Sequence, residues 1–393
     1  MSTLRSNINK FYLHRIFSSL IFSVPILVLF WKENGLSLTQ IMLLQSIFAI
    51  LSVVLEIPTG YYADMRTRKE SLVLASVSSF LGVLTYSLGE NFMHFLIGEL
   101  FFALAIALSS GTLSAFLFDT LEDLGETVQF KSIWGNALFY SMLGLGIANI
   151  IGGLLAEIGL RYAVYASVPF LFALIPLSLS LTEPNRHKLV ISKGYTSELI
   201  SIIKYQILKN QKLKWIIIYS GIVFAFNQSA LWLYQPYFQK TGLEVAYFGF
   251  VFGGFQLVAG ISSKYAYRVE NWLGKKASLA SLIFLVSLSY FLMEHFVYLF
   301  SFSFCFIQQF VRGFKKVVVD DFINQVSSSE TRATLLSAES FFARLVYAII
   351  LPFIGWSADA YGLLEAIFHL AITSLTCGVI LLLYFNKRLR HLF

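Results

Sequence analysis

Long hydrophobic stretches follow one another along almost the whole chain, and a basic polar stretch interrupts them once near the middle. A membrane-spanning helix needs about 20 apolar residues, because the hydrocarbon core is ~30 Å thick and a helix rises ~1.5 Å per residue. The pattern predicts twelve such helices rather than the short alternating strands of a barrel. They cover Phe11–Trp31, Ser37–Thr59, Ser71–Leu88, Phe92–Phe118, Ser132–Ala156, Arg161–Leu181, Leu213–Phe238, Glu244–Tyr267, Ala277–Met293, Phe296–Val319, Thr334–Ser357 and Leu363–Phe385. We therefore expect an all-α membrane protein.

The interruption, Thr182–Lys212, divides the chain into two halves of six predicted spans each. Apolar residues recur in it at helical spacing from Leu199 to Ile207, with lysines between them. We expect a loop and a short helix on the membrane surface, and a solvated linker helix is the alternative. The predicted domains are an N-terminal bundle (1–181), a basic linker (182–212) and a C-terminal bundle (213–393).

Two short sequences recur at one constant distance along the chain. Gly35-Leu36 returns as Gly242-Leu243, and Arg68-Lys69 before Ser71 returns as Lys275-Lys276 before Ser278, each 207 residues later. Matches at a single offset indicate two six-helix halves in parallel arrangement. This plan recurs in transporters, whose substrate path lies between the halves.

Composition and charge support a membrane protein and argue against a nucleic-acid-binding one. Hydrophobic residues make up 57% of the chain and charged residues 13%, which no soluble domain of this size combines. The net charge is +7. Of the basic residues that we place at the membrane surfaces, Lys32, Arg161 and Lys240 lie on one side and the others, including Lys315 and Lys316, on the opposite side. This asymmetry predicts cytoplasmic termini, in a bacterial inner membrane.

The loop after the second predicted span carries a family motif. Its sequence, GYYADMRTRK from Gly60 to Lys69, resembles the G-x-L-A-D-R-x-G-R-[RK] signature of the major facilitator superfamily. Met65 and Thr67 depart from the signature, and Arg66 supplies a charge one place along. The matching residues are Gly60, Ala63, Asp64, Arg68 and Lys69.

The resemblance implies the major facilitator fold of two pseudo-symmetric six-helix bundles. It also implies a conformational latch formed by Gly60, Asp64, Arg66, Arg68 and Lys69. Asp64 is expected to accept from Arg68, while Asp119 and Arg332 are candidate contacts. Gly60 is expected to admit a neighbouring backbone. The alternative for the basic residues is a purely topological role.

A second stretch, Gly144–Gly153 in the fifth predicted span, resembles the G-x-x-x-G-P-x-x-G-G motif of drug–proton antiporters. Gly144, Gly152 and Gly153 match, whereas Ala148 and Asn149 replace the central glycine and proline. Small residues at this spacing permit close helix crossing, so ordinary packing is the alternative interpretation.

Three carboxylates fall inside predicted spans, where a charge costs roughly 2.5–3.5 kcal/mol on insertion scales. Glu56, Glu99 and Glu339 are therefore candidates for proton coupling as unpaired groups. The alternatives are structural: Glu56 paired with Arg15, Glu99 facing the outer headgroups or a basic partner, and Glu339 in an interhelical pair.

Amides and arginines in the second half predict a polar substrate cavity, with interhelical hydrogen bonding as the alternative. Arg344 is a candidate for an anionic substrate group or for Glu99. Trp232, Tyr234 and Tyr237 favour an outer aromatic belt, and lining the cavity is the alternative. The cavity candidates are Arg344, Asn227, Gln228, Gln256, Gln308 and Arg312, with Gln309 beside them.

The sequence contains no phosphate-binding loop, no metal-ligand pattern and no recognisable catalytic set, so we expect neither an enzyme nor a cofactor. The leading prediction is a monomeric, proton-coupled exporter of small molecules working by alternating access. The alternatives are an importer or carrier of an anionic metabolite, and a non-transporting membrane receptor or scaffold.

Overall fold

The computed structural model describes residues 2–185, 210–327 and 331–389. Within these ranges the regular structure is entirely helical. The predicted surface helix in Thr182–Lys212 lies almost wholly outside the described residues. Eleven described helical segments are long and apolar enough to cross a membrane, in agreement with the predicted all-α membrane fold.

The first half of the chain holds eight α-helices and two short 3-10 helices. They are α1 (Ser2–Ser19), η1 (Val24–Ile26), α2 (Leu27–Glu33), α3 (Leu38–Met65), α4 (Arg68–Leu88), α5 (Phe92–Ser109), α6 (Thr112–Asp123), η2 (Thr127–Gln129), α7 (Phe130–Ile158) and α8 (Leu160–Leu179). The second half holds α10 (Gln211–Lys240), α11 (Val245–Leu273), α12 (Lys275–His295), η3 (Leu299–Phe304), α13 (Cys305–Val326), α14 (Arg332–Tyr361) and α15 (Leu363–Leu389).

Two predicted spans are broken rather than continuous. The first is divided into α1, η1 and α2 around Pro25, which has no backbone N–H to donate. There the N–H of Phe22 donates to Oγ of Ser167 at 3.0 Å. The fourth is divided into α5 and α6 at Gly111, whose φ of 70° lies in the left-handed region that glycine tolerates.

The tenth predicted span, Phe296–Val319, is wrong in its bounds. It consists of η3 and the first part of α13, and α13 is not among the eleven apolar segments. The cause is its charged side chains, which include Arg312, Lys315 and Asp320. With 22 residues, α13 is nevertheless long enough to cross a bilayer.

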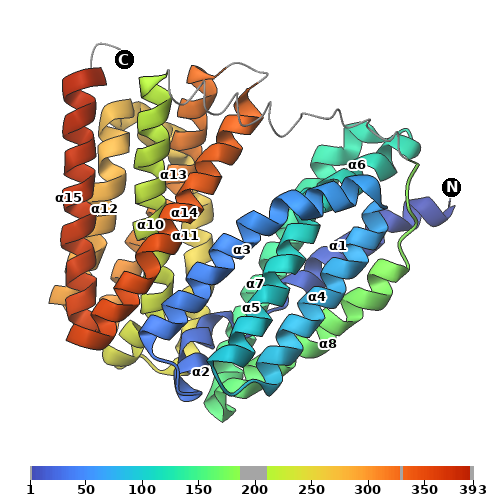
Figure 1. The fold of residues 1–393 in the computed structure, drawn as a ribbon, viewed down its shortest axis with the longest axis horizontal. Coiled ribbons are helices and arrows are strands. Elements are labelled where there is room, and N and C mark those ends of the chain that lie inside the picture. The colour runs from blue at the N-terminus through green and yellow to red at the C-terminus, as the bar shows by residue number, and fades with distance from the viewer. Residues whose placement is uncertain (1, 186–209, 328–330, 390–393) are drawn as a thin grey trace. The chain divides into compact units, whose positions relative to one another are not determined.

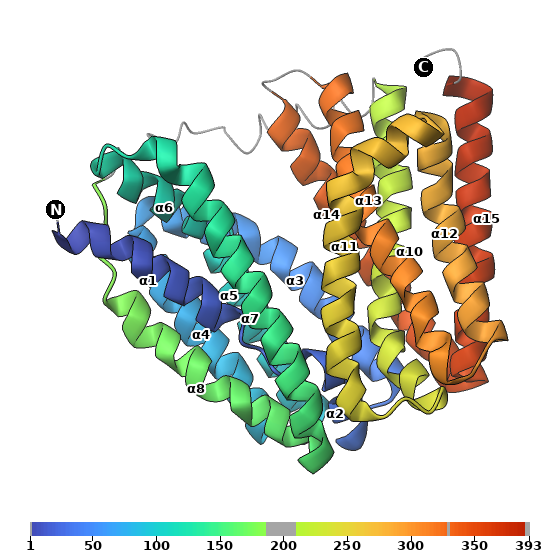
Figure 2. The ribbon, with the colours of Figure 1, turned by 180° about the vertical axis from the view of Figure 1, so that it is seen from behind.

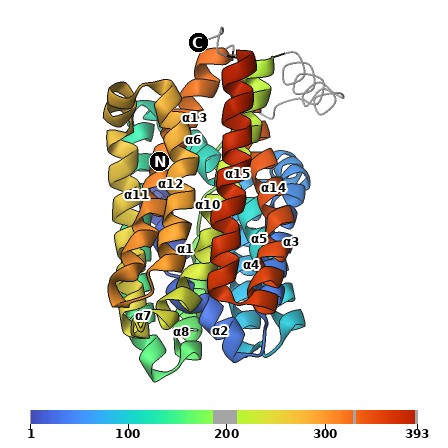
Figure 3. The same cartoon turned by 90° about the vertical axis from the view of Figure 1, so that its left-hand side faces the viewer.

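The chain forms two compact units. Unit 1 comprises residues 1–36, 47–190 and 244–253, and unit 2 comprises residues 37–46, 191–243 and 254–393. The start of α3 thus belongs to unit 2, and the start of α11 belongs to unit 1. In unit 1, α4 lies between α5 and α8, as Figure 1 shows. In unit 2, α10 packs on α13, α14 and α15 (Figure 2), and α12 runs beside α15 (Figure 3).

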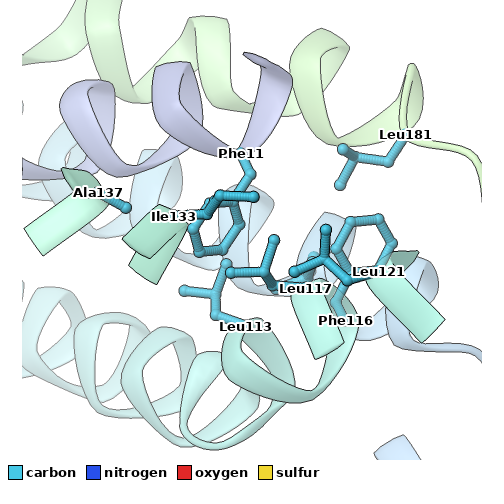
Figure 4. Packing of buried hydrophobic residues seen from close by; sticks show 9 residues of the cluster. Phe11, Leu113, Phe116, Leu117, Leu121, Ile133, Ala137 and Leu181 are labelled. Atoms are coloured by element: carbon cyan, nitrogen blue, oxygen red, sulfur yellow. The ribbon is translucent and has the colours of Figure 1, made fainter. Parts of the chain in front are cut away.

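The core of unit 1 joins the start of α1 to α6 and α7. Phe11 is 1% exposed and points toward Leu113, Leu117 and Ile133 (Figure 4). Phe116, Leu121 and Leu181 extend the same cluster toward the end of α8. Large apolar side chains at helical spacing on α6 explain this packing, because residues three and four positions apart share one helix face.

The three aromatic residues of the predicted belt make contacts inside unit 2. Tyr234 and Tyr237 are 1% and 0% exposed, and the Tyr237 hydroxyl donates to the carbonyl of Phe296 at 3.0 Å. Trp232 donates through Nε1 to the Tyr347 hydroxyl at 2.6 Å. Each polar tip has a partner inside the unit, and the two tyrosine rings belong to its core.

Candidate functional site

The loop between α3 and α4 carries the first cluster of charged contacts in unit 1. Arg68 donates from Nε to the Asp119 carboxylate of α6 at 2.5 Å. Glu183 accepts the backbone N–H groups of Arg68 and Lys69 at 2.9 and 2.7 Å. A carboxylate at a helix N-terminus satisfies backbone donors that have no partner within the helix. The cluster therefore anchors the start of α4 to α6 and to the segment after α8.

The predicted latch residues have mixed outcomes. Arg68, which was expected to donate to Asp64, donates to Asp119, one of the candidate latch contacts. The side chain of Asp64 lies outside the described residues. At Gly60 no described atom lies within 4 Å of a Cβ position, so the expected close backbone is not found there. Arg66 is exposed, and Arg332 donates only weakly, at 3.4 Å, to the Asn324 carbonyl.

The glycine motif of α7 makes three close approaches in unit 1. A side chain at Gly152 would collide with the backbone of Phe22, and one at Gly144 would meet Oγ of Ser19. A Cβ at Gly153 would lie 2.8 Å from the carbonyl oxygen of Ala246 at the start of α11. The motif therefore has the packing role that small residues at this spacing allow.

Asn149, which stands where the antiporter motif has proline, is fully buried at the same crossing. Its side-chain amide has no hydrogen-bond partner among the described residues. Gly249 of α11 lies directly against the Asn149 backbone, and Ala148 beside it is 0% exposed. The α7–α11 crossing is thus tightly packed but carries an uncompensated polar group.

A second crossing, within unit 2, joins the start of α3 to the end of α14. Asp359 accepts the backbone N–H groups of Leu38 and Thr39 at 3.0 and 2.8 Å and the Thr39 hydroxyl at 2.6 Å. Gly355 lies against the Thr39 backbone, and Ser46 donates to the carbonyl of Ala348. The carboxylate of α14 therefore caps α3 from outside that helix.

Replacing Asp359 by alanine is expected to lower the stability of the protein by about 0.5–2 kcal/mol, the usual cost of losing an N-cap. Asparagine keeps only one of the two acceptor oxygens and places an NH2 group in the position of the other, so Asp359→Asn should retain only part of that stability. Thermal unfolding of the purified variants measures the difference. An alanine variant that unfolds at the wild-type temperature would show that the cap contributes nothing.

Two of the three predicted proton-coupling carboxylates lie in unit 1. Glu99 is 4% exposed and accepts a hydrogen bond from the Tyr86 hydroxyl at 2.5 Å. Gly98 makes this contact possible, because its bare Cα faces the Tyr86 ring. Glu56 is exposed and accepts from Ser110 at 3.2 Å, and the alternative pairing with Arg15 is not formed in the described structure.

The third carboxylate, Glu339 in unit 2, is not unpaired but forms an interhelical ion pair, which is the structural alternative for this residue. Lys315 of α13 donates to it at 3.0 Å, and the Ser220 hydroxyl of α10 donates to the same oxygen. The Lys315 side chain is 13% exposed and also lies 5.2 Å from the centre of the Phe224 ring. Assigning Lys315 to the membrane surface was therefore wrong.

A polar pocket opens in unit 2 between α10 and α13. Its enclosed volume is about 10 Å³, and the space reaches about 210 Å³ when the open side is included. Amides, one hydroxyl and one guanidinium line it together with a single leucine. The lining residues are Asn227, Gln228, Leu231, Tyr234, Gln309 and Arg312. The lining therefore offers both hydrogen-bond donors and hydrogen-bond acceptors, together with one positive charge.

The structure brings together five of the six predicted cavity residues at or beside this pocket. Asn227, itself a lining residue, donates from Nδ2 to Oε1 of Gln308 at 2.7 Å. Gln256 of α11 accepts from Nη2 of Arg312 at 2.9 Å. Gln228 also lines the pocket.

Arg344 is not among the pocket-lining residues. It is half-buried on α14 and has neither an ion pair nor a hydrogen bond with the residues described. Two further residues line the pocket: Gln309, which the sequence places beside the cavity candidates, and Tyr234, for which lining the cavity is the alternative to an aromatic belt. The spacing of Gln309 and Arg312, three residues apart on one helix, is the signal that could have identified that face.

Comparisons with known proteins agree with this fold. The model of the Major Facilitator Superfamily matches residues 13–314. Comparison with curated protein sequences gives no match.

Solved transporter structures resemble the chain over nearly its full length. A point mutant of the nucleoside transporter NupG has a TM-score of 0.81 at 13% identity, covering 98% of this chain and 99% of that one. A bacterial homologue of the human lysosomal transporter Spinster has a TM-score of 0.71 at 15% identity, with coverages of 98% and 94%. A POT family transporter in complex with 5-aminolevulinic acid has a TM-score of 0.70 at 10% identity, with coverages of 97% and 96%.

These likenesses show the predicted fold, and the family match extends over most of the chain. The chain belongs to the Major Facilitator Superfamily and is a membrane transport protein rather than an enzyme.

Proposed function

We propose that this transporter moves a small polar solute by alternating access, and that the solute binds at the pocket between α10 and α13. The observation that carries the proposal is the lining of that pocket, where Gln228, Tyr234, Gln309 and Arg312 present polar groups to one space. Few, well-placed polar groups are typical of small-molecule sites. A lipophilic cation would meet no carboxylate among these lining residues.

A nucleoside is the substrate class that this lining supports best. It is uncharged, and its base and ribose offer several donors and acceptors to amides and hydroxyls. One of the structural neighbours is a nucleoside transporter, which makes the class a specific one to test. A peptide fits less well, because its ammonium group would meet only the cation Arg312.

Binding to the purified full-length protein tests this choice. A ligand that binds only the folded state raises its stability by RT ln(1 + [L]/Kd), ~2.7 kcal/mol at a hundredfold excess over Kd. Uridine should raise the unfolding temperature, whereas a dipeptide and a lipophilic cation should leave it unchanged. Stabilisation by the cation alone would support an exporter of amphipathic compounds and contradict the nucleoside assignment.

An anionic metabolite is the second candidate, because Arg312 places a guanidinium in the pocket and Arg344 lies on a neighbouring helix of unit 2. Short carboxylates belong in the same binding series for this reason. If carboxylates stabilise the protein and uridine does not, and if Arg344→Ala abolishes that stabilisation, the protein is an anion carrier.

Proton coupling through Glu99 is our proposal for the energy source. A carboxylate that is buried against a tyrosine hydroxyl can hold a proton in one access state and release it in the other. We expect Glu99→Gln to abolish the acceleration of uridine flux by a pH gradient in proteoliposomes, while exchange of uridine for uridine continues. Tyr86→Phe keeps the carboxylate and should keep part of the acceleration.

Coupling that persists in Glu99→Gln would exclude Glu99 as the proton carrier. Glu339 would then be the remaining buried candidate, through its pair with Lys315. We further propose a monomer with cytoplasmic termini in a bacterial inner membrane. Outward transport is proposed on the partial antiporter motif at Gly144–Gly153.

A further inference from the structure

We infer that Oε1 of Gln309 accepts a hydrogen bond from the transported solute. Gln309 and Arg312 together then recognise an N–H group beside a carbonyl, with Gln309 binding the N–H group and Arg312 the carbonyl. Such an edge occurs in lactams and imides, which include the uracil base. The inference rests on the proposed function, because it assigns the recognition chemistry of the same pocket.

Gln309 is buried at the pocket, and only one end of its side-chain amide is hydrogen-bonded. Its side chain lines the pocket although the residue is just 5% exposed. Its Nε2 donates to the Tyr234 hydroxyl at 3.1 Å. Oε1 has no donor among the residues that the structure describes. A buried acceptor in this position is destabilising until a donor reaches it.

The preceding residue, Gln308, shows what a structural glutamine looks like on the same helix. It is 0% exposed, and its Oε1 receives the Asn227 amide at 2.7 Å. Its Nε2 donates to the carbonyl of Val286 at 3.1 Å. Both ends of this amide are used within unit 2, so of these two neighbouring glutamines Gln309 is the one with an acceptor left for a solute.

Arg312 supplies the complementary donors. It follows Gln309 by three residues on α13, and side chains at this spacing are neighbours on one helix face. A guanidinium has five N–H donors, and the bond to Gln256 at 2.9 Å uses one of them. A solute that gives a hydrogen to Gln309 and accepts one from Arg312 must therefore carry a donor next to an acceptor.

The direct test compares three ligands on the wild-type protein. Uridine has an imide N–H at position 3, 3-methyluridine lacks it, and 5-methyluridine carries the same methyl group elsewhere on the ring. Binding titrations should show 3-methyluridine weaker than uridine by at least about tenfold, because the buried acceptor then stays unpaired. 5-Methyluridine should bind within about threefold of uridine, since its N–H is intact.

The matching variant is Gln309→Met, which removes the acceptor and keeps the length of the side chain. In it, uridine and 3-methyluridine should bind with equal affinity. Gln309→Glu keeps an acceptor and should keep the preference for uridine. If the methionine variant does not fold, the ligand comparison on the wild-type protein decides by itself.

The outcomes distinguish the role of Gln309 from the proposed substrate class. Equal binding of uridine and 3-methyluridine to the wild-type protein would overturn the role of Gln309 and leave a nucleoside transporter. Absence of binding by all three nucleosides would overturn the proposed substrate class, and the role of Gln309 with it.

Discussion

Replacing Lys315 by methionine is expected to destabilise the protein by about 3–5 kcal/mol, the usual cost of removing one partner of a buried ion pair. Glu339 would then keep the Ser220 hydroxyl as its remaining donor in the described structure, in a site that is only 11% exposed. The loss is large because the carboxylate stays buried when its cation is gone.

Lys316 provides the matched control on the same helix. Its side chain is 79% exposed, and it approaches Asp320 at 3.7 Å. Exposed pairs contribute ~0–1 kcal/mol, so Lys316→Met should unfold close to the wild-type temperature. Thermal unfolding of the two variants and of the double variant Lys315→Met/Glu339→Met measures the contrast. Equal, small losses for both lysines would show that the Lys315–Glu339 pair is not a buried pair.

Replacing Gly152 by alanine is the second change with a large expected effect. The new methyl group would collide with the backbone of Phe22, and that backbone is held by Oγ of Ser167 and by the nearby Pro25. A flexible side chain could move aside, but this backbone cannot without breaking its hydrogen bond. We expect a loss of at least ~1–3 kcal/mol, as for overpacked cores, and poor recovery of folded protein.

Gly146 lies on the same helix and faces open space, since no described atom lies within 4 Å of its Cβ position. Gly146→Ala should therefore be neutral or slightly stabilising, because alanine favours the helix by up to ~1 kcal/mol over glycine. Recovery and unfolding temperature of the two alanine variants provide the test. A stable Gly152→Ala protein would mean that α7 does not approach Phe22 so closely.

The membrane spans could be predicted because apolar length alone determines them. The breaks at Pro25 and Gly111 could have been placed from those two residues, whose backbone preferences oppose a continuous helix. The bounds and character of α13 could not be inferred in the same way. Its charged side chains lower the local hydropathy, and their partners lie on other helices of unit 2.

The sequence predicted which polar residue types form the candidate site, but not which individual residues are buried there. Neighbouring residues point about 100° apart on a helix, so Lys315 and Lys316, or Gln308 and Gln309, face different surroundings. One sequence does not reveal which of each pair is buried, because that depends on the packing of α10, α11 and α14 around α13. The cap from Asp359 to Leu38 joins residues more than 300 positions apart and has no local signal.

Counterflow in proteoliposomes tests most directly whether this chain is a nucleoside transporter working by alternating access. Vesicles containing the purified protein and unlabelled uridine are diluted into a trace of labelled uridine. Alternating access to one binding site predicts a transient accumulation of label above its equilibrium level, absent in protein-free vesicles. Label that enters at the same rate with and without the protein would contradict a nucleoside transporter.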